Sequence, residues 1–192
     1  VWHMQWPLLV LLVLWFGLVE WAGHNTLEFA LDSNGPGWPN PPWSTFLLRS
    51  LMENYDFKIK FINHFCFYLN SRFEPSYISS HLESTINNIA PEMPNHISKW
   101  GGSYNEWYNQ HINVLWQFAN QRSNYVFDHL SDYFSLDVDG TSNLILSSTP
   151  ENGGVLQTSG QTVPENPWEA KYFNDIRIEI TAIPNPGYIF SH

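Results

Sequence analysis

The sequence predicts an α+β fold in which a mainly helical part precedes a small antiparallel β module. Residues 45–134 carry apolar side chains at helical spacing, with capping and stop signals between the apolar runs. Residues 136–192 instead show short β-branched runs separated by Gly, Pro, Asn and Ser. We therefore divide the 192 residues into a helical part, 1–135, and a β-rich module, 136–192.

The first helices follow a loop that is rich in proline and glycine, residues 35–42. Ser44 or Thr45 is a suitable cap for a helix that runs to about Glu53, and Asp56 is the predicted cap of the next one. The inward face of this second helix repeats every four residues. It consists of Phe57, Phe61, Phe65 and Leu69.

The third helix is predicted to begin at Pro75, because proline is favoured in a first helical turn. Its apolar positions are Ile78, Leu82, Ile86 and Ile89. Pro91 and Pro94 bracket a turn before a short helix that Gly101 ends near Trp100.

Ser103 and Glu106 form a capping box for a long helix over residues 104–122, and a last helix is expected over 124–134. The expected inward face of the long helix consists of Trp107, His111, Val114, Leu115 and Phe118. All the helices are expected to pack as one unit. The residues expected to be largely buried are Phe57, Phe61, Phe65, Ile78, Leu82, Trp107 and Phe118.

Strands are predicted over residues 144–146, 155–158 and 176–182. The last run alternates apolar and polar residues and should end at Pro184, which cannot donate a ladder hydrogen bond. Its expected inward residues are Ile176, Ile178, Ile180 and Ala182. A module of about 50 residues is marginal by itself, so it should lean on the helical part or be poorly ordered.

Composition excludes one class of partner. Eight basic residues against 18 acidic ones give a net charge of −10, which leaves no basic footprint for nucleic acid.

Residues 8–19 are strongly apolar but shorter than the roughly 20 residues of a membrane span, so no transmembrane helix is expected. The chain begins with Val1, and we interpret it as a fragment that starts with a buried strand or a disrupted segment, with an interfacial anchor as the alternative. The single cysteine, Cys66, is interpreted as a buried apolar residue.

Four segments occur in an order that carries a family resemblance: LRSLMEN (48–54), FKIKFIN (57–63), LNSRF (69–73) and PEMPNHISKWG (91–101). Together they resemble the C-terminal half of the kinase-like domain of the CotH family, the spore-coat-protein-H-type atypical kinases. The resemblance implies a kinase-like C-lobe. It also implies a parent protein that transfers the γ-phosphate of ATP, with Mg²⁺, to Ser or Thr of a partner protein.

The resemblance also identifies what this chain lacks. CotH-type kinases carry an Asp-x-Asp segment closely followed by Phe-Gly, for which Phe16–Gly17 is the counterpart here. The acids would then fall at about Leu11 and Val13, which can neither coordinate Mg²⁺ nor accept a proton. No Lys or Arg precedes Arg49. We therefore assign no catalytic, cofactor-binding or metal-ligating residue, and expect the fragment to be catalytically incompetent. A frame error, a signal-like segment and true divergence all remain open as the origin of this difference.

Other candidate groups have simpler interpretations. The stretch 137–140 with Asn143 is similar to part of a calcium loop, but its glycine is misplaced and a linker turn is favoured. Arg49 and Glu92 are interpreted as tethers of the helical scaffold. Four histidines lack metal-site spacing and are assigned packing or surface roles. They are His64, His81, His96 and His111.

The alternative function is a cell-surface binding or adhesion module without enzymatic activity. The pattern of Gly153–Gly154, Tyr172–Phe173 and residues 182–190 resembles small β-repeats of bacterial extracellular proteins. Abundant Trp and Tyr could stack on a glycan or a surface protein. Either interpretation places the protein outside a bacterial cell or on its surface.

Overall fold

The computed structural model describes residues 22–34, 41–137 and 140–191, and it confirms the α+β class. Helices make up 52% of the described residues and strands 15%, and the helical part precedes the β part. The predicted N-terminal apolar segment and Phe16–Gly17 lie outside the described residues, as do residues 35–40 of the predicted loop.

The helical elements follow the chain in a simple order. They are α2 (Thr26–Leu31), α3 (Phe46–Met52), α4 (Tyr55–Leu69), α5 (Pro75–Ile89), the 3₁₀ turn η1 (Ala90–Glu92), α6 (Met93–Trp100), α7 (Tyr104–Glu106), the π-helical segment η2 (Trp107–Ile112) and α8 (Asn113–Phe134).

The prediction of Asp56 as a cap was wrong. Asn54 has the extended backbone of a cap, and its side chain accepts a hydrogen bond of 2.9 Å from the Phe57 amide. Asp56 instead lies in the first turn of α4, where its negative carboxylate interacts favourably with the positive end of the helix dipole. Two other helix signals hold: Pro75 opens α5, and Gly101 ends α6 with a φ of 85°.

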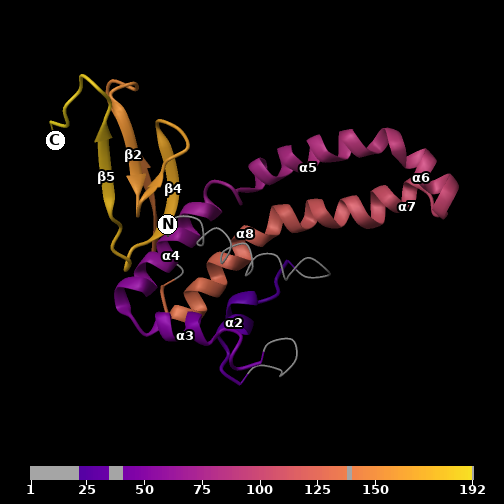
Figure 1. Cartoon of the computed structure of the whole chain (residues 1–192), viewed down its shortest axis with the longest axis horizontal. Helices are drawn as coiled ribbons and strands as arrows, with labels where there is room; N and C mark the ends of the chain where they lie inside the picture. Colours follow the sequence, from indigo (N-terminus) through magenta and orange to yellow (C-terminus); the bar gives the residue numbers. More distant parts are fainter. Residues whose placement is uncertain (1–21, 35–40, 138–139, 192) are drawn as a thin grey trace.

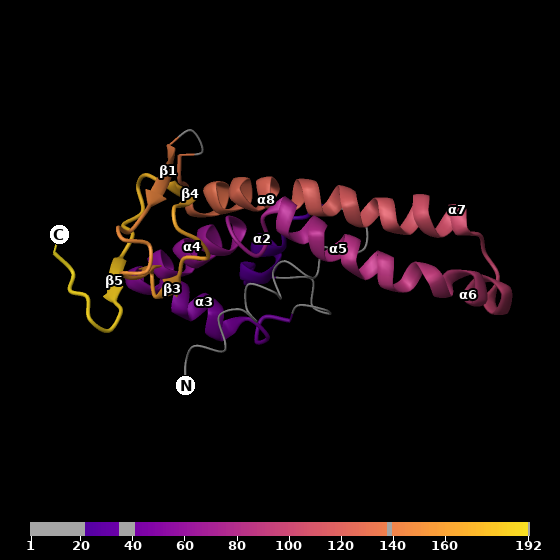
Figure 2. The ribbon, with the colours of Figure 1, turned by 90° about the horizontal axis from the view of Figure 1, so that it is seen from above.

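One long arm dominates the shape of the molecule. In Figure 1, α5 and α6 run out to the right, and α7 and α8 return antiparallel to them. Figure 2 shows the same arm from above, with the β part at the opposite end and α4 near it. The arm is a two-helix structure in which α5 packs on α8.

This two-helix geometry limits how much apolar side-chain surface the arm can bury. Phe61 and Phe65 of α4 are fully buried, as predicted. Ile78, Leu82 and Trp107, which were predicted to be largely buried, are only half-buried, and so are Phe57 and Phe118. For the three arm residues the reason is that a helix in a two-helix arm has one packing partner, so no residue of α5 is fully buried.

The predicted break between residues 122 and 124 does not exist. Arg122 and Ser123 are buried within α8, which continues to Phe134 because no Gly or Pro interrupts it. The predicted inward face of this helix was also partly wrong, since His111 and Val114 are exposed while Ile112 is buried. A π-helical turn adds one residue to the helical repeat, so η2 shifts the register of the face that follows it.

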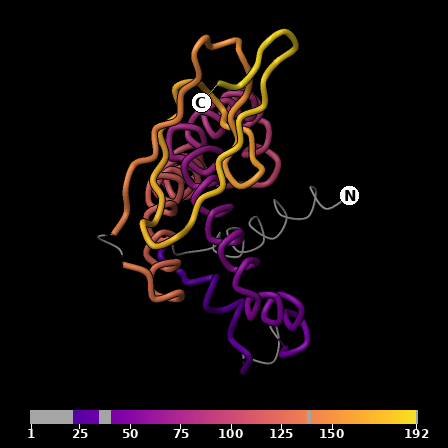
Figure 3. The backbone as a smooth tube through the Cα atoms, turned by 90° about the vertical axis from the view of Figure 1, so that its left-hand side faces the viewer, coloured from indigo at the N-terminus to yellow at the C-terminus, as the bar shows by residue number. Residues whose placement is uncertain are grey.

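The β part consists of two antiparallel sheets. Its strands are β1 (Thr141–Leu146), β2 (Gly154–Thr158), β3 (Gln161–Thr162), β4 (Trp168–Phe173) and β5 (Ile180–Pro184). One sheet pairs β1 with β4, and the other has the order β3-β2-β5. Figure 3, viewed from this end, shows the strands in front of the helices.

The β part leans on the helical part, as predicted, and β4 makes the contact. Trp168 of β4 is 1% exposed, and its ring lies 5.3 Å from that of Phe67 in α4. The core cluster contains residues of α2, α3, α4, α8, β1 and β4. The segment β4 was not predicted because its Glu, Ala and Lys residues disfavour strands.

The last strand is shorter than predicted. Ile176 is buried, but pairing with β2 begins only at Ile180, which is half exposed rather than inward. The strand does end at Pro184, as expected. The Ile180 side chain is half exposed because β4, rather than β5, is the strand that packs against α4.

Among the described helices, none combines the length and the apolar character needed to cross a bilayer.

Candidate functional site

The best-defined polar site in the helical part lies where α8 holds the segment that enters α2. Arg122 is 3% exposed and sits in the middle of α8. Its Nη1 donates to the carbonyl oxygens of Ala22 and His24, at 2.7 and 2.6 Å. Its Nη2 donates to Thr26 Oγ1 at 2.7 Å. The planar guanidinium thus fixes three points along residues 22–26, and we call this arrangement the α8 clamp.

The α8 clamp holds a positive charge that no carboxylate neutralises among the described residues. Desolvation lowers the pKa of Arg122 to about 10, so the side chain stays protonated at neutral pH. The Phe118 ring lies 5.9 Å from the guanidinium carbon, and no described residue accepts a hydrogen bond from Nε. Such a group cannot exchange protons near pH 7, and its chemistry is to position the backbone and to attract negative charge.

Two aromatic residues of α8 flank the clamp: Tyr125 lies one turn beyond Arg122, and His129 lies two turns beyond it. A Cβ at Gly23 would already touch the Tyr125 ring at 3.4 Å, so this ring packs closely on the segment. The Tyr125 and His129 rings are stacked with centroids 6.4 Å apart. Burial and then the Arg122 charge lower the pKa of His129, which favours a neutral imidazole beside the cation.

The two charged residues of the family-like motifs differ in their roles. Arg49 donates to Thr45 Oγ1 at 2.5 Å and to the Pro42 carbonyl, so it tethers the loop before α3, as predicted. Glu92 is exposed and only accepts a hydrogen bond of 3.1 Å from Asn95. The prediction that Glu92 tethers the helical scaffold was wrong: in the described structure its side chain stabilises only the local turn between η1 and α6.

The histidines are dispersed, as the sequence indicates. His64 Nδ1 lies 2.7 Å from the Lys60 carbonyl, and His81 Nδ1 lies 3.1 Å from the Tyr77 carbonyl. His96 and His111 are exposed. Within the described ranges, no three His, Cys, Asp or Glu side chains come together as a metal site. The calcium-like stretch includes residues 138–139, which are not described, while Asn143 donates across the strands to Glu169.

Comparison with known families adds one decisive observation. Residues 17–126 match the family model described as CotH kinase protein, which is more than half of the chain. The chain belongs to the CotH kinase protein family. A search of the curated proteins and a search of the solved structures give no match.

The CotH match covers the α8 clamp but not the β part. Residues 22–26 and Arg122 both lie inside the matched range, whereas His129 and all five strands lie beyond it. The positions at which the CotH resemblance places the acids, Leu11 and Val13, precede both the match and the described residues. The clamp therefore holds the CotH segment that follows Gly17.

Sequence reasoning missed Arg122, although a signal was present. Phe118, Arg122 and Val126 follow each other at four-residue spacing, which places a charge on an apolar stripe. Asn63 interrupts the stripe of Ile59 and Phe67 in the same way. A polar residue on a buried face needs a partner, and such a position indicates a structural or binding role.

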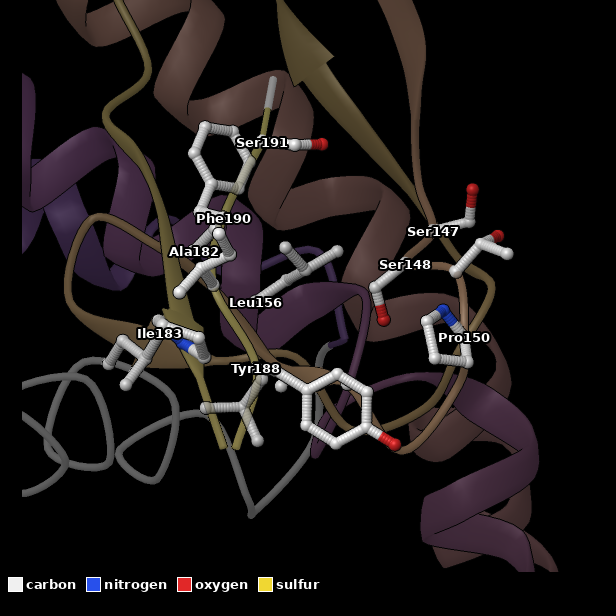
Figure 4. Close-up of a pocket in the computed structure, with 15 residues that line it drawn as sticks. Ser147, Ser148, Pro150, Leu156, Ala182, Ile183, Tyr188, Phe190 and Ser191 are labelled. Atoms are coloured by element: carbon white, nitrogen blue, oxygen red, sulfur yellow. The ribbon is translucent and has the colours of Figure 1, made fainter. Parts of the chain in front are cut away.

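The β part beyond the CotH match has a cleft of its own, of about 200 Å³. Figure 4 shows Ser147, Ser148 and Pro150 on one side, and Ala182, Ile183 and Phe190 on the other. Tyr188 and Phe190 are 40% and 64% exposed, so both offer aromatic surface to a ligand. Hydroxyl groups beside exposed rings suit a polar ligand with flat apolar faces, as a sugar has.

Proposed function

We propose that residues 1–135 are the C-terminal part of the kinase-like domain of a CotH-type protein whose complete form transfers the γ-phosphate of ATP to Ser or Thr of a partner protein. The CotH family match over residues 17–126 supports this proposal. In the complete protein, ATP and Mg²⁺ are the expected cofactors. We further propose that the 192-residue chain does not carry out this reaction by itself.

The observation that carries the second proposal is the identity of two residues. Phosphoryl transfer needs a carboxylate to hold Mg²⁺ and a group to orient the nucleophile. The corresponding positions hold Leu11 and Val13, and no Lys or Arg precedes Arg49. Hydrocarbon side chains supply neither metal ligand nor base.

In this proposal Arg122 is a positioning residue. It fixes the backbone of residues 22–26, which directly follow the region where CotH kinases carry their Phe-Gly segment. A catalytic loop must be held within a fraction of an ångström for efficient transfer. The α8 clamp would supply that rigidity in the complete kinase.

A transfer assay tests the proposal. The purified chain is incubated with γ-labelled ATP, Mg²⁺ or Mn²⁺ and a Ser-rich protein, beside a CotH protein that has the Asp-x-Asp-x-x-Phe-Gly segment. We expect label transfer by the second protein only. Transfer by this chain well above a boiled sample would overturn the proposed incompetence.

Sequencing the DNA upstream of the Gly17 codon tests the kinase origin, since a kinase predicts an Asp-containing segment there in one reading frame.

The cleft of the β part favours a second candidate function. We propose as the alternative that residues 136–192 form a repeat-like extracellular module that binds a surface glycan, and that the protein acts on a bacterial cell surface. The exposed Tyr188 and Phe190 rings and the Ser147 and Ser148 hydroxyls support this alternative. Calorimetry with a panel of soluble oligosaccharides tests it. Binding that Tyr188→Ala abolishes and Tyr108→Ala leaves unchanged would support it, whereas no binding across the panel would contradict it.

A further inference from the structure

An exposed apolar stripe runs along α3 and past both of its ends. Trp43 is 79% exposed, Leu47 71%, Leu51 37% and Tyr55 64%. Leu47 and Leu51 lie one turn apart on the same face of α3, and Trp43 and Tyr55 continue the four-residue spacing before and after it. We call these four residues the α3 stripe. Figure 1 shows α3 below α4, away from the arm and from the sheets.

The opposite side of α3 already supplies its contact with the core. Leu48 is buried, and Met52 packs against the core cluster. Among the described elements, α4 is the main packing partner of α3. The α3 stripe therefore takes no part in the core of this chain. A contiguous apolar surface of several hundred Å² that stays exposed marks an interaction site in a folded protein.

The size of this surface fits an interface between two copies of the chain. Phe46 lies at the rim of the α3 stripe, one position before Leu47, and is 64% exposed. With its aromatic members at about 150–250 Å² each when fully exposed, the stripe and its rim offer roughly 600 Å². Two such surfaces would bury about 1,200 Å² in total, which is the lower end of the range for stable protein interfaces. Aromatic residues with no charge among them are also the composition of interface cores.

The order of side chains along the α3 stripe is the same from either end. It runs aromatic, leucine, leucine, aromatic, so both the Trp43–Tyr55 pair and the Leu47–Leu51 pair are centred on position 49. In a two-fold interface, residue i contacts residue j of the other copy and j contacts i. A two-fold axis at this centre would bring Trp43 onto the partner's Tyr55 and Leu47 onto the partner's Leu51. The stripe is thus complementary to a second copy of itself.

The charges around α3 agree with a protein partner rather than a lipid surface. Arg49 is half-buried and donates to Thr45 Oγ1 and the Pro42 carbonyl, so an axis near it does not bring two free cations together. A helix that lies on a membrane carries Lys and Arg on its polar face. Arg49 is the only basic residue of α3, and the exposed residues that follow the stripe include the acidic Glu53 and Asp56.

We propose that the α3 stripe is a two-fold interface through which two copies of this chain associate, with the two α3 helices antiparallel. Trp43 and Tyr55 cover each other at the ends of the interface, and the leucines pack at its centre. This association is independent of the kinase reaction proposed above, since it needs neither ATP nor a metal ion.

Sedimentation equilibrium of the full chain between about 1 and 100 µM measures the association. We expect a monomer–dimer equilibrium whose dissociation constant rises at least about tenfold in Leu47→Lys. Ile145→Lys is the matched control, because Ile145 is 64% exposed but lies on β1, so the equilibrium should stay unchanged. Both variants should keep the circular dichroism spectrum of the unchanged protein, since both positions are exposed.

Complementary variants test the two-fold contact itself. Leu47→Lys and Leu51→Glu should each weaken self-association. An equimolar mixture of the two should associate more tightly than either variant alone, because the axis brings position 47 of one copy onto position 51 of the other. A mixture that associates no better than its components would contradict the antiparallel contact.

Three further results would overturn the proposal. They are a chain that stays monomeric up to about 100 µM, a dimer that Leu47→Lys leaves unchanged, and a dimer that Ile145→Lys weakens as much as Leu47→Lys does. Binding of a monomeric chain to phosphatidylcholine vesicles, lost in Leu47→Lys, would also overturn it and would assign the α3 stripe to a membrane surface.

Discussion

Asn70 and Lys171 lie 101 positions apart, yet they exchange two hydrogen bonds. Asn70 Nδ2 donates to the Lys171 carbonyl and Asn70 Oδ1 accepts from the Lys171 amide, both at 2.9 Å. The same Nδ2 donates to the Cys66 carbonyl at 2.6 Å. Asn70 therefore caps the end of α4 and, at the same time, satisfies backbone groups on the edge of β4 that β1 does not reach. One side chain thus fixes the strand against the helix.

Replacing this asparagine should loosen the joint between helix and strand. We expect Asn70→Ala to lower the free energy of unfolding by roughly 1–3 kcal/mol, because the Lys171 amide and carbonyl lose their partners. Urea unfolding measures this loss, and amide exchange at Lys171 should become faster. Asn120→Ala is the control, since Asn120 only donates to the Trp116 carbonyl at an exposed position. Equal losses for both variants would contradict the assigned role.

The α8 clamp should respond to the shape of its cation as well as to its charge. We expect Arg122→Met to cost about 3 kcal/mol of stability, since one buried and two part-buried acceptors lose their donor. Arg122→Lys should recover little of this, because a single ammonium cannot reproduce the planar fork. Both variants should make residues 22–26 more sensitive to limited proteolysis.

The control for the clamp is Arg72→Met. Arg72 is exposed, and among the described residues its side chain bonds to and stacks over Tyr77, so its loss should change stability by less than about 0.5 kcal/mol. If Arg122→Lys is as stable as the unchanged protein, the three-point hydrogen bonding has no structural importance.

The aromatic stripe of α4 predicts a large difference between two phenylalanines. Phe61 is 1% exposed and packs on Phe65, with ring centroids 4.8 Å apart. Phe61→Ala should cost roughly 3–5 kcal/mol, because it leaves a cavity in the core. Phe46 on α3 is 64% exposed, and Phe46→Ala should cost less than about 0.5 kcal/mol. Chemical denaturation of both variants gives the comparison, and a loss below about 1 kcal/mol at Phe61 would show that the stripe is not core.

Two buried histidines predict a loss of stability in mild acid. Burial lowers the pKa of both His64 and His129 below the usual 6.5. The unfolded chain then binds more protons than the native chain just below pH 6.5, so these groups make stability fall as the pH falls. The urea midpoint should decrease from pH 7.5 to pH 5.5. The double variant His64→Gln, His129→Gln should show a smaller decrease, and an unchanged slope would assign the acid sensitivity to other groups.

The helices could be predicted because their signals are local. Phe57, Phe61 and Phe65 repeat at helical spacing, and Pro75 and Gly101 act on the backbone within their own turns. The order of helical and β parts followed from these signals, and residues 48–101 by themselves carried the CotH resemblance. The sequence also suffices to exclude Leu11 and Val13 as metal ligands. A side chain without a ligand atom cannot hold Mg²⁺ wherever it lies in the fold.

Tertiary structure decided which of these surfaces are covered and which polar groups meet. Ile78 and Leu82 have the same period as the α4 stripe but stay half-buried, because α5 lies in a two-helix arm. Arg122 meets residues 22–26, and Asn63 Nδ2 meets the Arg177 carbonyl, only because the fold brings together segments about a hundred residues apart. Helical period specifies which side of a helix is apolar, but burial and hydrogen-bond pairing depend on the elements that pack against it.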